Sequence, residues 1–270
     1  MNRIVLITSS SFRHLYFIKK LNDVFGEKVI NFFIETTSNL NYDHINKKNN
    51  LDVKEIHFNQ RHNSEIDFFS DSLTIMDSEK LRLIKKGDIN KTKIVSEIKK
   101  IRPDIILTYG CSIIQKPLLN LFKNKIINVH LGLSPYYLGA GTNFHALVNN
   151  EFHFFGYSII FMDEGIDTGK IIHQSRPIFF LNDTPHTLGN RLIKKMAADM
   201  VKLVDNFCQI EDLKKININF NSKNFKIIDC DDFKVRKLYR EFNNNLKSYQ
   251  KNKEKLCEKY PIIEQKFMKE

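Results

Sequence analysis

The first 34 residues carry the pattern that most restricts the fold. A short apolar run at residues 3–7, RIVLI, precedes a stretch at residues 12–25 whose apolar side chains have helical spacing. A second apolar run, VINFFI, follows at residues 29–34. A strand, a helix and a strand in so short a segment form a βαβ unit, in which the two strands lie parallel. The sequence therefore predicts an α/β fold built on a parallel sheet.

The same alternation continues along the chain. Further buried strands are predicted at residues 104–109, 126–129, 156–162 and 170–174. Helices are predicted at residues 64–86, 91–101 and 184–207. We therefore expect a Rossmann-like domain over residues 1–205, with a mostly parallel sheet. Residues 206–270 are polar and rich in lysine, and they predict a small helical or extended appendage in which Leu238, Phe242, Leu246 and Tyr249 share one helical face.

Charge and cysteine content restrict the class of protein. The chain has 42 Lys and Arg residues against 31 Asp and Glu residues, a formal net charge of +11. This surplus favours an anionic partner such as a nucleotide-linked substrate, while the lack of a dense basic run or an RNA-binding motif argues against nucleic acid. No apolar run approaches the length of a membrane span, and the short N-terminal run lacks the features of a signal peptide, so we expect a cytoplasmic protein. The four cysteines have no metal-binding spacing, and no metal is expected.

The polar loops that follow the predicted strands are the places to look for a binding site. Ligands of open parallel sheets bind beyond the carboxyl ends of the strands. The loops expected at that edge are residues 8–14, 110–115, 128–141 and 163–169.

Three side chains in these loops form a candidate catalytic group. Asn128 and His130 are two residues apart on a strand, so both point to the same face. Asp167 lies in a glycine-flanked loop that can reach the same cleft. The amide and a protonated imidazole suit stabilisation of a tetrahedral oxyanion, and the carboxylate suits holding the imidazole charged and accepting a proton from an amine. Acyl transfer to an amine that attacks directly needs no serine or cysteine nucleophile.

Three motifs in order resemble a known family. They are YGCSIIQKPLL at 109–119, NVHLGLSPYYLGAG at 128–141 and DEGIDTG at 163–169. Together they resemble the formyltransferases that use N10-formyltetrahydrofolate, over residues 78 to 205. The resemblance implies that Asn128, His130 and Asp167 are the catalytic trio, that N10-formyltetrahydrofolate is the co-substrate, and that no metal takes part.

The same resemblance implies two walls for the folate pocket. One is the backbone of the segment that precedes the catalytic strand, and the other is the loop that carries Asp167. The residues concerned are Gly110, Cys111, Ser112, Ile113, Asp163, Gly165 and Ile166.

The segment after the first strand, TSSSFRH, departs from the glycine-rich turn of the purine-pathway members of that family. Ser10, Arg13 and His14 lie where a helix N-terminus can meet an anion. We predict that they contact a phosphate or diphosphate of the amine substrate. The alternative is that Arg13 is a solvated surface residue and that His14 packs in the core.

The loop after the catalytic strand supplies the other candidate substrate contacts. Tyr136 and Tyr137 could stack on a base or a sugar, or could cover the loop. Asn143 is placed at the edge of the cleft, and His145 beside it is expected to have a structural role.

Three functions are compatible with these features. The first is formylation of the amino group of a nucleotide-linked sugar for a surface polysaccharide such as lipopolysaccharide. The second is a methionyl-tRNA formyltransferase, which the net positive charge suits, although that family carries a C-terminal β-barrel where this sequence has a polar, helical pattern. The third is a non-catalytic binding module of the same fold, which would have no need of the amide, imidazole and carboxylate. A homodimer is left open.

Overall fold

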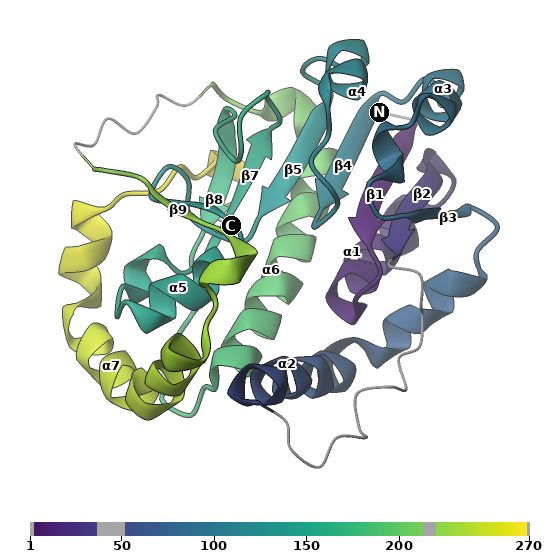
Figure 1. Cartoon of the computed structure of the whole chain (residues 1–270). Coiled ribbons are helices and arrows are strands. Elements are labelled where there is room, and N and C mark those ends of the chain that lie inside the picture. The colour runs from purple at the N-terminus through teal and green to yellow at the C-terminus, as the bar shows by residue number, and fades with distance from the viewer. Residues whose placement is uncertain (1–2, 37–51, 213–219, 269–270) are drawn as a thin grey trace.

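A seven-stranded sheet forms the centre of the molecule (Figure 1). The computed structural model describes residues 3–36, 52–212 and 220–268. The order of the strands across the sheet is β3-β2-β1-β4-β5-β7-β8. Their bounds are Ile4–Ser9 for β1, Val29–Thr36 for β2, Leu81–Lys85 for β3, Ile105–Tyr109 for β4, Ile126–His130 for β5, Tyr157–Phe161 for β7 and Ile171–Ser175 for β8.

Strands β1 to β5 run parallel, and only β7 runs against its neighbours. The mostly parallel α/β sheet predicted from the sequence is thereby confirmed. Since the five parallel strands end at one edge, the loops that follow β1, β4 and β5 meet there.

Seven helices are described. Their bounds are Phe12–Phe25 for α1, Val53–Phe69 for α2, Thr92–Ile101 for α3, Lys116–Leu121 for α4, Thr142–Val148 for α5, Pro185–Asp205 for α6 and Asp232–Lys259 for α7. Thr184 caps α6 by accepting a hydrogen bond from the Thr187 amide, and Pro185 occupies the first turn. Within the described ranges, no helix is both long enough and apolar enough to cross a membrane.

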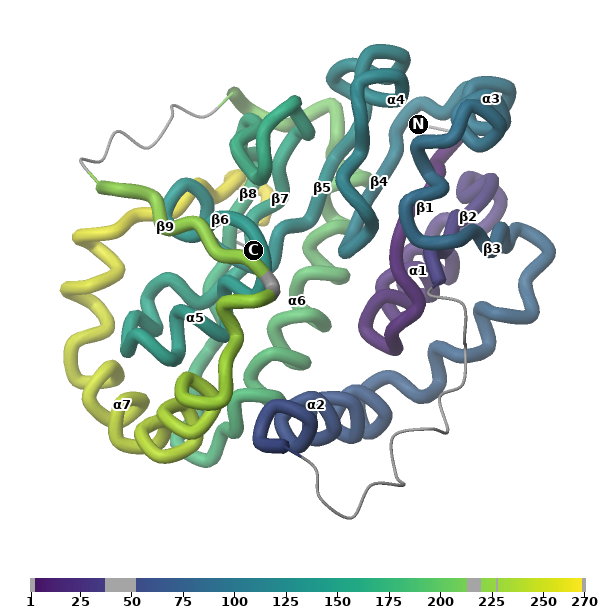
Figure 2. Tube along the Cα trace, viewed as in Figure 1, coloured from purple at the N-terminus to yellow at the C-terminus, as the bar shows by residue number. Residues whose placement is uncertain are grey.

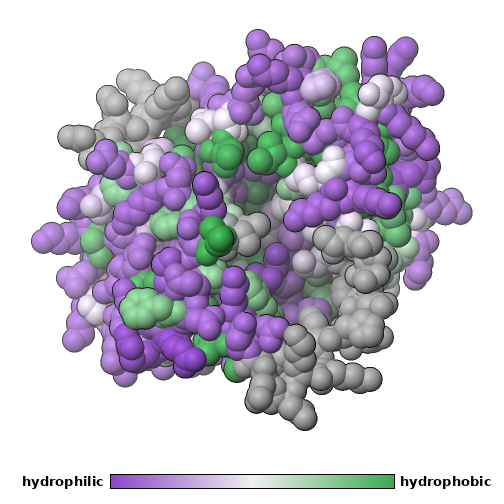
Figure 3. All heavy atoms as spheres, in the orientation of Figure 1, coloured by the Kyte–Doolittle hydropathy of each residue, from purple (hydrophilic) through white to green (hydrophobic). Residues whose placement is uncertain are grey.

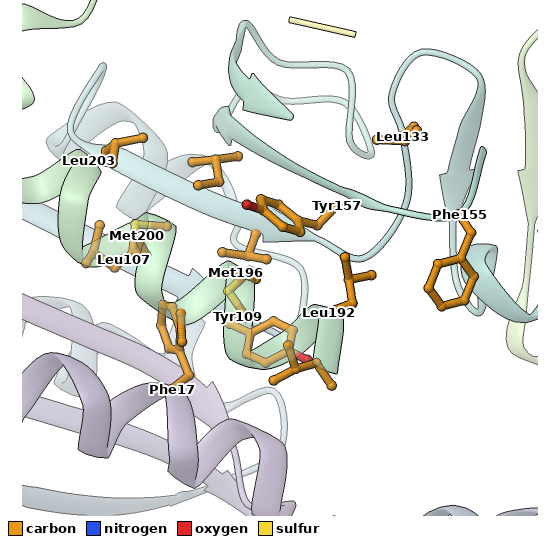
Figure 4. Packing of buried hydrophobic residues seen from close by; sticks show 14 of the residues in the cluster. Phe17, Leu107, Tyr109, Leu133, Phe155, Tyr157, Leu192, Met196, Met200 and Leu203 are labelled. Atoms are coloured by element: carbon orange, nitrogen blue, oxygen red, sulfur yellow. The ribbon is translucent and has the colours of Figure 1, made fainter. Parts of the chain in front are cut away.

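Side chains that alternate along β1 face two separate cores. Ile4 and Leu6 belong to the larger core, which lies against α1 and α6. Val5 and Ile7 belong to a smaller core formed with α3 and α4. Every one of these four residues is fully buried, as the two-residue period of a strand covered on both faces requires. Figure 4 shows part of the larger core, where Met196 and Met200 of α6 pack near Phe17, Leu107 and Tyr109.

One predicted helix is wrong over part of its length. The structure ends α2 at Phe69 and forms an edge strand, β3, where residues 64–86 were predicted to be helical throughout. The sequence LRLIKK is compatible with a helix or a strand. Only Leu81 and Ile84 are partly buried, and their spacing of three residues also fits one turn of a helix, while Leu83 is exposed. Parallel pairing with β2 decides in favour of the strand.

The C-terminal residues pack directly on the sheet. The predicted helical face of α7 is buried, and Leu238, Phe242, Leu246 and Tyr249 join the same core as the sheet and α6. Beyond α7, the backbone amide of Gln174 in β8 donates to the carbonyl of Ile263 at 2.6 Å. A short strand β9, Lys223–Phe225, pairs with β6, Tyr137–Gly139, which belongs to the loop after β5. The predicted appendage therefore has its hydrophobic core in common with the sheet.

Candidate active site

Asn128 is held in a fixed orientation by the neighbouring strand. In the parallel register of β4 and β5, Thr108 lies beside Asn128. The Thr108 hydroxyl donates to Oδ1 of Asn128 at 2.8 Å. Because the amide oxygen is engaged in this way, the Nδ2 group remains as the donor of this side chain.

His130 ends β5 and is only 5% exposed. Its Nδ1 atom lies 3.1 Å from Oδ2 of Asp167, and its Nε2 atom lies 2.9 Å from the carbonyl oxygen of Tyr137. Both partners are acceptors, so both contacts are hydrogen bonds only when the ring carries two protons. The imidazole thus sits between a carboxylate and a backbone carbonyl.

Asp167 reaches His130 because the loop between β7 and β8 runs back along β5. The amide of Met162 donates to the carbonyl of Ile126 at the start of β5, whereas Asp167 meets the end of the same strand. Oδ2 of Asp167 also accepts the amide of Gly139 at 3.0 Å. Asp167 has a φ of 56°, a left-handed conformation that aspartate and asparagine adopt more readily than most residues.

A pocket of about 130 Å³ lies beside this group. Asn128 and Asp167 both line it, and His130 does not. The other lining residues are Cys111, Ser112, Ile113, Ile114, Ile160, Met162, Asp163, Glu164, Gly165 and Ile166. Ile113 and Ile166 are 70% and 55% exposed, so two apolar side chains flank a pocket that has a few polar groups inside, as is typical of small-molecule sites.

Six of the seven residues predicted to form the folate pocket line this cavity, and Gly110 does not. Gly110 has a φ of 65°, and a Cβ there would lie 2.2 Å from Nε2 of His14. It provides room for His14 and does not contact the pocket. Burial raises the pKa of the Cys111 thiol to about 12, which makes it a poor nucleophile.

Two residues that hold the pocket wall were not predicted. Glu35, at the end of β2, accepts the amides of Gly87 at 2.8 Å and Ser112 at 2.6 Å. Asn90 accepts the amide of Gln115 and donates to the carbonyl of Ile113, at 2.8 and 2.9 Å. Glu35 could have been predicted from the sequence, because it is a charged residue at the end of an apolar strand, at the edge of the sheet where ligands bind.

The predicted contacts near the first helix are corrected by the structure. His14 is buried, its pKa is lowered well below the usual range by burial, and its ring packs edge-on against Tyr109 at 4.6 Å. Arg13 is paired with the buried carboxylate of Glu65 and is not a solvated residue. Ser10 lies in the turn between β1 and α1.

Arg61 was not predicted and lies beside the same carboxylate. Its Nε atom is buried 3.6 Å from Glu65, while its side chain as a whole is 42% exposed. Burial, followed by repulsion from Arg13, lowers the pKa of Arg61 to about 10, so the guanidinium remains charged at neutral pH. Two arginines therefore share one glutamate, which leaves one positive charge in excess.

The predicted contacts in the loop after β5 are also corrected. The side chains of Tyr136 and Tyr137 are fully buried and cannot stack on a ligand. Asn143 uses both ends of its amide on the backbone of Gly156, at 2.9 and 3.0 Å. His145 is buried and stacks on Phe225 with ring centroids 4.1 Å apart, in the structural role expected. These residues form the framework of the loop.

Figure 3 shows a hollow near the middle of the face that contains the ends of β4 and β5 in Figure 1. Hydrophobic residues lie above the hollow and hydrophilic residues lie in its lower part. A larger pocket, of about 500 Å³, lies between α2, α6 and α7. It includes none of the predicted site residues, so the smaller pocket beside Asn128 and Asp167 is the candidate active site.

Comparison with known families and sequences gives one consistent family. A model described as formyl transferase matches residues 27–204. The methionyl-tRNA formyltransferase of Finegoldia magna is 31% identical over 132 residues, which cover 46% of this chain and 42% of that protein. The corresponding protein of Syntrophomonas wolfei is 33% identical over 145 residues, which cover 53% and 45%. The chain thus spans less than half the length of these relatives.

Solved structures with a similar fold include two sugar-modifying enzymes. A sugar N-formyltransferase from Shewanella sp FDAARGOS_354 has a TM-score of 0.55 and 20% identity, and the match covers 85% of this chain and 78% of that one. WlaRD, a sugar 3N-formyl transferase solved in the presence of dTDP and 5-N-formyl-THF, has a TM-score of 0.54 and 20% identity, with 90% and 80% covered. A phosphoribosylglycinamide formyltransferase from Streptococcus pneumoniae has a TM-score of 0.54 and 16% identity, with 77% and 99% covered. At these identities the likeness shows the fold.

Proposed function

Because the chain belongs to the formyl transferase family, we propose that it transfers a formyl group from N10-formyltetrahydrofolate to a primary amine. The observation that carries this proposal is the pocket wall that Asn128 and Asp167 share. A hydrogen-bond donor and a proton acceptor face one small cavity, which is what addition of an amine to a formyl carbon requires.

The pocket residues fit a folate. Ile113, Ile160, Met162 and Ile166 offer apolar surface for a flat heteroaromatic ring, and the backbone of 111–113 and 163–166 offers hydrogen-bonding groups. When bound there, the folate supplies the formyl group. Its binding energy depends on the wall that Glu35 and Asn90 hold in place.

Two residues act on the reacting atoms in this proposal. The Nδ2 group of Asn128 donates to the formyl oxygen as negative charge develops on it. Oδ1 of Asp167, which has no hydrogen-bond partner among the described residues, accepts the proton that the attacking amine loses. The bond between the formyl carbon and N10 of the folate then breaks, and the proton passes to the leaving N10.

His130 acts through Asp167 in this arrangement. An oxyanion role was predicted for the imidazole from the sequence. Because its ring lies between the carboxylate and the Tyr137 carbonyl, we propose a positioning role in its place. The contact of the His130 ring with Oδ2 also holds the carboxylate in place, so that Oδ1 is the oxygen left for the reacting amine.

We propose a nucleotide-linked amino sugar as the amine substrate. The excess positive charge on Arg61 and Arg13, beside the end of β4, suits the phosphates of such a molecule. From the sequence, Arg13 was predicted to contact a phosphate of the amine substrate. We assign this contact to Arg61, whose side chain is partly exposed. Two of the solved structures with a similar fold are sugar formyltransferases, and one of them was solved with dTDP and a folate. Such a product would serve synthesis of a surface polysaccharide such as lipopolysaccharide.

The second candidate substrate is methionyl-tRNA. The sequence relatives are methionyl-tRNA formyltransferases, and the net charge of +11 suits a polyanion. Arg61 could bind a phosphate of either substrate, so the two functions have to be separated by experiment.

The test is a formylation assay over a panel of amines. The protein is incubated with N10-formyltetrahydrofolate and, in separate reactions, with dTDP-, UDP- and GDP-linked amino sugars or methionyl-tRNA, and the acceptors are analysed by mass spectrometry. A gain of one formyl group on an amino sugar, absent with Asp167→Asn, supports the proposal. A gain on methionyl-tRNA alone rejects the sugar substrate, and no gain on any acceptor rejects the proposed transfer to these amines.

A further inference from the structure

The short strand β6 supplies a backbone contact to each member of the His130–Asp167 pair. The carbonyl of Tyr137 accepts from Nε2 of His130 at 2.9 Å, and the amide of Gly139 donates to Oδ2 of Asp167 at 3.0 Å. The two contacts are only two residues apart on β6. The position of β6 therefore determines how the imidazole and the carboxylate face each other.

Strand β6 is held in place by a segment far along the chain. It pairs in parallel with β9, and the two strands lie side by side in Figure 2. The amide of Ala140 donates to the carbonyl of Phe225, and the amide of Lys223 donates to that of Tyr136, both at 2.9 Å. The ring of Phe225 stacks on Tyr137 with centroids 5.2 Å apart.

A chain of polar side chains joins the same two strands. The buried hydroxyl of Tyr137 donates to the carboxylate of Glu151 and accepts from Asn149 at 3.0 Å. Nζ of Lys223 donates to both carboxylate oxygens of Glu151, at 2.7 and 2.6 Å. Burial, and then the bond to Glu151, raise the pKa of Tyr137 well above its usual range, so the hydroxyl keeps its proton and remains a donor.

We propose that Lys223 and Glu151 are positioning residues for the active site. Joined through the Tyr137 hydroxyl, they fix β6 so that its carbonyl meets His130 and its amide meets Asp167. The proposal rests on the proposed function in one respect, since it takes the His130–Asp167 pair to be part of the reacting site.

The effect of Lys223 and Glu151 on the site depends on the several contacts that hold Tyr137 in place. Tyr137 is held by its ring, its hydroxyl and its backbone pairing, and its carbonyl is the acceptor for His130. Removing the Lys223 ammonium leaves the partly exposed carboxylate of Glu151 with the tyrosine hydroxyl alone, so that the carboxylate can turn toward solvent and no longer fixes Tyr137. Small displacements of groups that act on a transition state cost large factors in rate, whereas binding of either substrate should change little.

The first measurement needs no substrate. The full chain is labelled with ¹⁵N-histidine, and the ring N–H signals of His130 are assigned by their loss in His130→Gln. In the wild-type protein we expect an Nε2–H signal protected from exchange by the Tyr137 carbonyl. Lys223→Met should broaden or remove that signal, Lys223→Arg should restore it, and Lys266→Met should leave it unchanged. Lys266 is the matched control, because it forms an exposed pair with Glu211 elsewhere in the C-terminal segment.

The second measurement is kinetic and uses the acceptor identified by the amine panel. Lys223→Met should lower kcat at least tenfold with both KM values within about twofold, and Glu151→Gln should act in the same direction. Tyr137→Phe keeps the ring and the backbone carbonyl and loses only the link, so it should show an intermediate loss and serves as a second variant if Lys223→Met does not fold.

The outcomes separate the two proposals. If Lys223→Met retains the Nε2–H signal of His130 and has the same kcat as the control Lys266→Met, the positioning role is refuted. If the signal changes as expected but no amine on the panel is formylated, the positioning role stands and the proposed substrates are rejected. If kcat and melting temperature fall together in Lys223→Met and Lys223→Arg restores only the melting temperature, the ion pair is structural and the proposal fails.

Discussion

Hydrogen-bonded neighbours set the orientation of the reactive side chains in this site. The Asn128 amide is oriented by Thr108, and the Asp167 carboxylate is oriented by the Gly139 amide and the His130 ring. Because each partner is itself buried or part of the backbone, the donor and the acceptor are in place before a substrate arrives. Such preorganisation is the main source of electrostatic catalysis.

Substitutions at Asn128 and Asp167 should separate chemistry from folding. Asp167→Asn keeps the size of the side chain and tolerates the φ of 56°, but it removes the proton acceptor, so kcat should fall by orders of magnitude at nearly unchanged stability. Asn128→Ala should cost about 2–4 kcal/mol in the barrier, the usual size for one oxyanion donor. Single-turnover rates and thermal melts check both, and variants with near wild-type rates would refute the assigned roles.

Gly132→Ala tests how closely the loop passes His130. A Cβ at position 132 would lie 2.4 Å from Nε2 of His130 and 2.5 Å from Oγ1 of Thr142, so the ring has to move. We expect at least a tenfold loss of kcat with the fold retained by circular dichroism. Gly189→Ala is the control: no atom lies within 4 Å of its Cβ, and it should raise helix stability by roughly 0.5–1 kcal/mol. Equal kinetics in the two variants would contradict the crowding described.

Arg61 and Arg13 should respond differently to removal of their charge. Arg61→Met should raise the KM for a phosphate-bearing amine and leave the KM for the folate unchanged, because its guanidinium is partly exposed beside Glu65. Arg13→Met leaves the buried carboxylate of Glu65 without its closest partner and should destabilise the fold by about 3–5 kcal/mol. Kinetics with charged and uncharged amines, together with chemical denaturation, make the comparison. A loss at Arg61 that is equal for both amines would assign it to structure.

At the scale of elements, α7 and the sheet form one core. Leu246 is fully buried in the cluster that includes β1, β4 and α6, whereas Phe233 on the same helix is 71% exposed. A helix packed in this way contributes to the stability of the whole fold, since its buried face has no core of its own.

Leu246→Ala should therefore destabilise the entire molecule. The expected loss is about 2–5 kcal/mol, the range for removal of a buried leucine side chain, and unfolding should remain a single transition in urea. Phe233→Ala should change the free energy of unfolding by less than about 0.5 kcal/mol, as exposed sites usually do. Two separate transitions in Leu246→Ala would show that residues 220–268 unfold on their own.

How far the sequence predicts each element depends on the range of its contacts. The βαβ unit and the strand that ends in His130 are visible in local periodicity. β3 is not, because a five-residue edge strand with two half-buried side chains has the spacing of a helix turn.

The site residues that the sequence analysis missed depend on contacts between distant parts of the chain. Arg61 lies in a stretch of sequence with no clear periodic pattern. Lys223 and Glu151 are 72 residues apart, and no local rule connects them. Thr108 could have been found, since two strands that end together place it beside Asn128.

At the scale of the whole molecule, the site is assembled from distant parts of the chain. Thr108, Asn128, Asp167 and the strand at Lys223–Phe225 meet at one edge of the sheet. Because the loops that separate these residues have to close first, we expect these long-range contacts to form late in folding.

The pairing of β6 with β9 has a consequence for synthesis of the protein. A nascent chain whose residues 223–225 are still inside the ribosome can form the parallel strands β1 to β5, but its β6 lacks its strand partner β9. The carbonyl of Tyr136 and the amide of Ala140, which bond to β9 in the folded protein, are then unpaired and form an open edge to which another chain can add. Activity should therefore be absent from stalled products that end before residue 223, and those products should be the ones that need a chaperone.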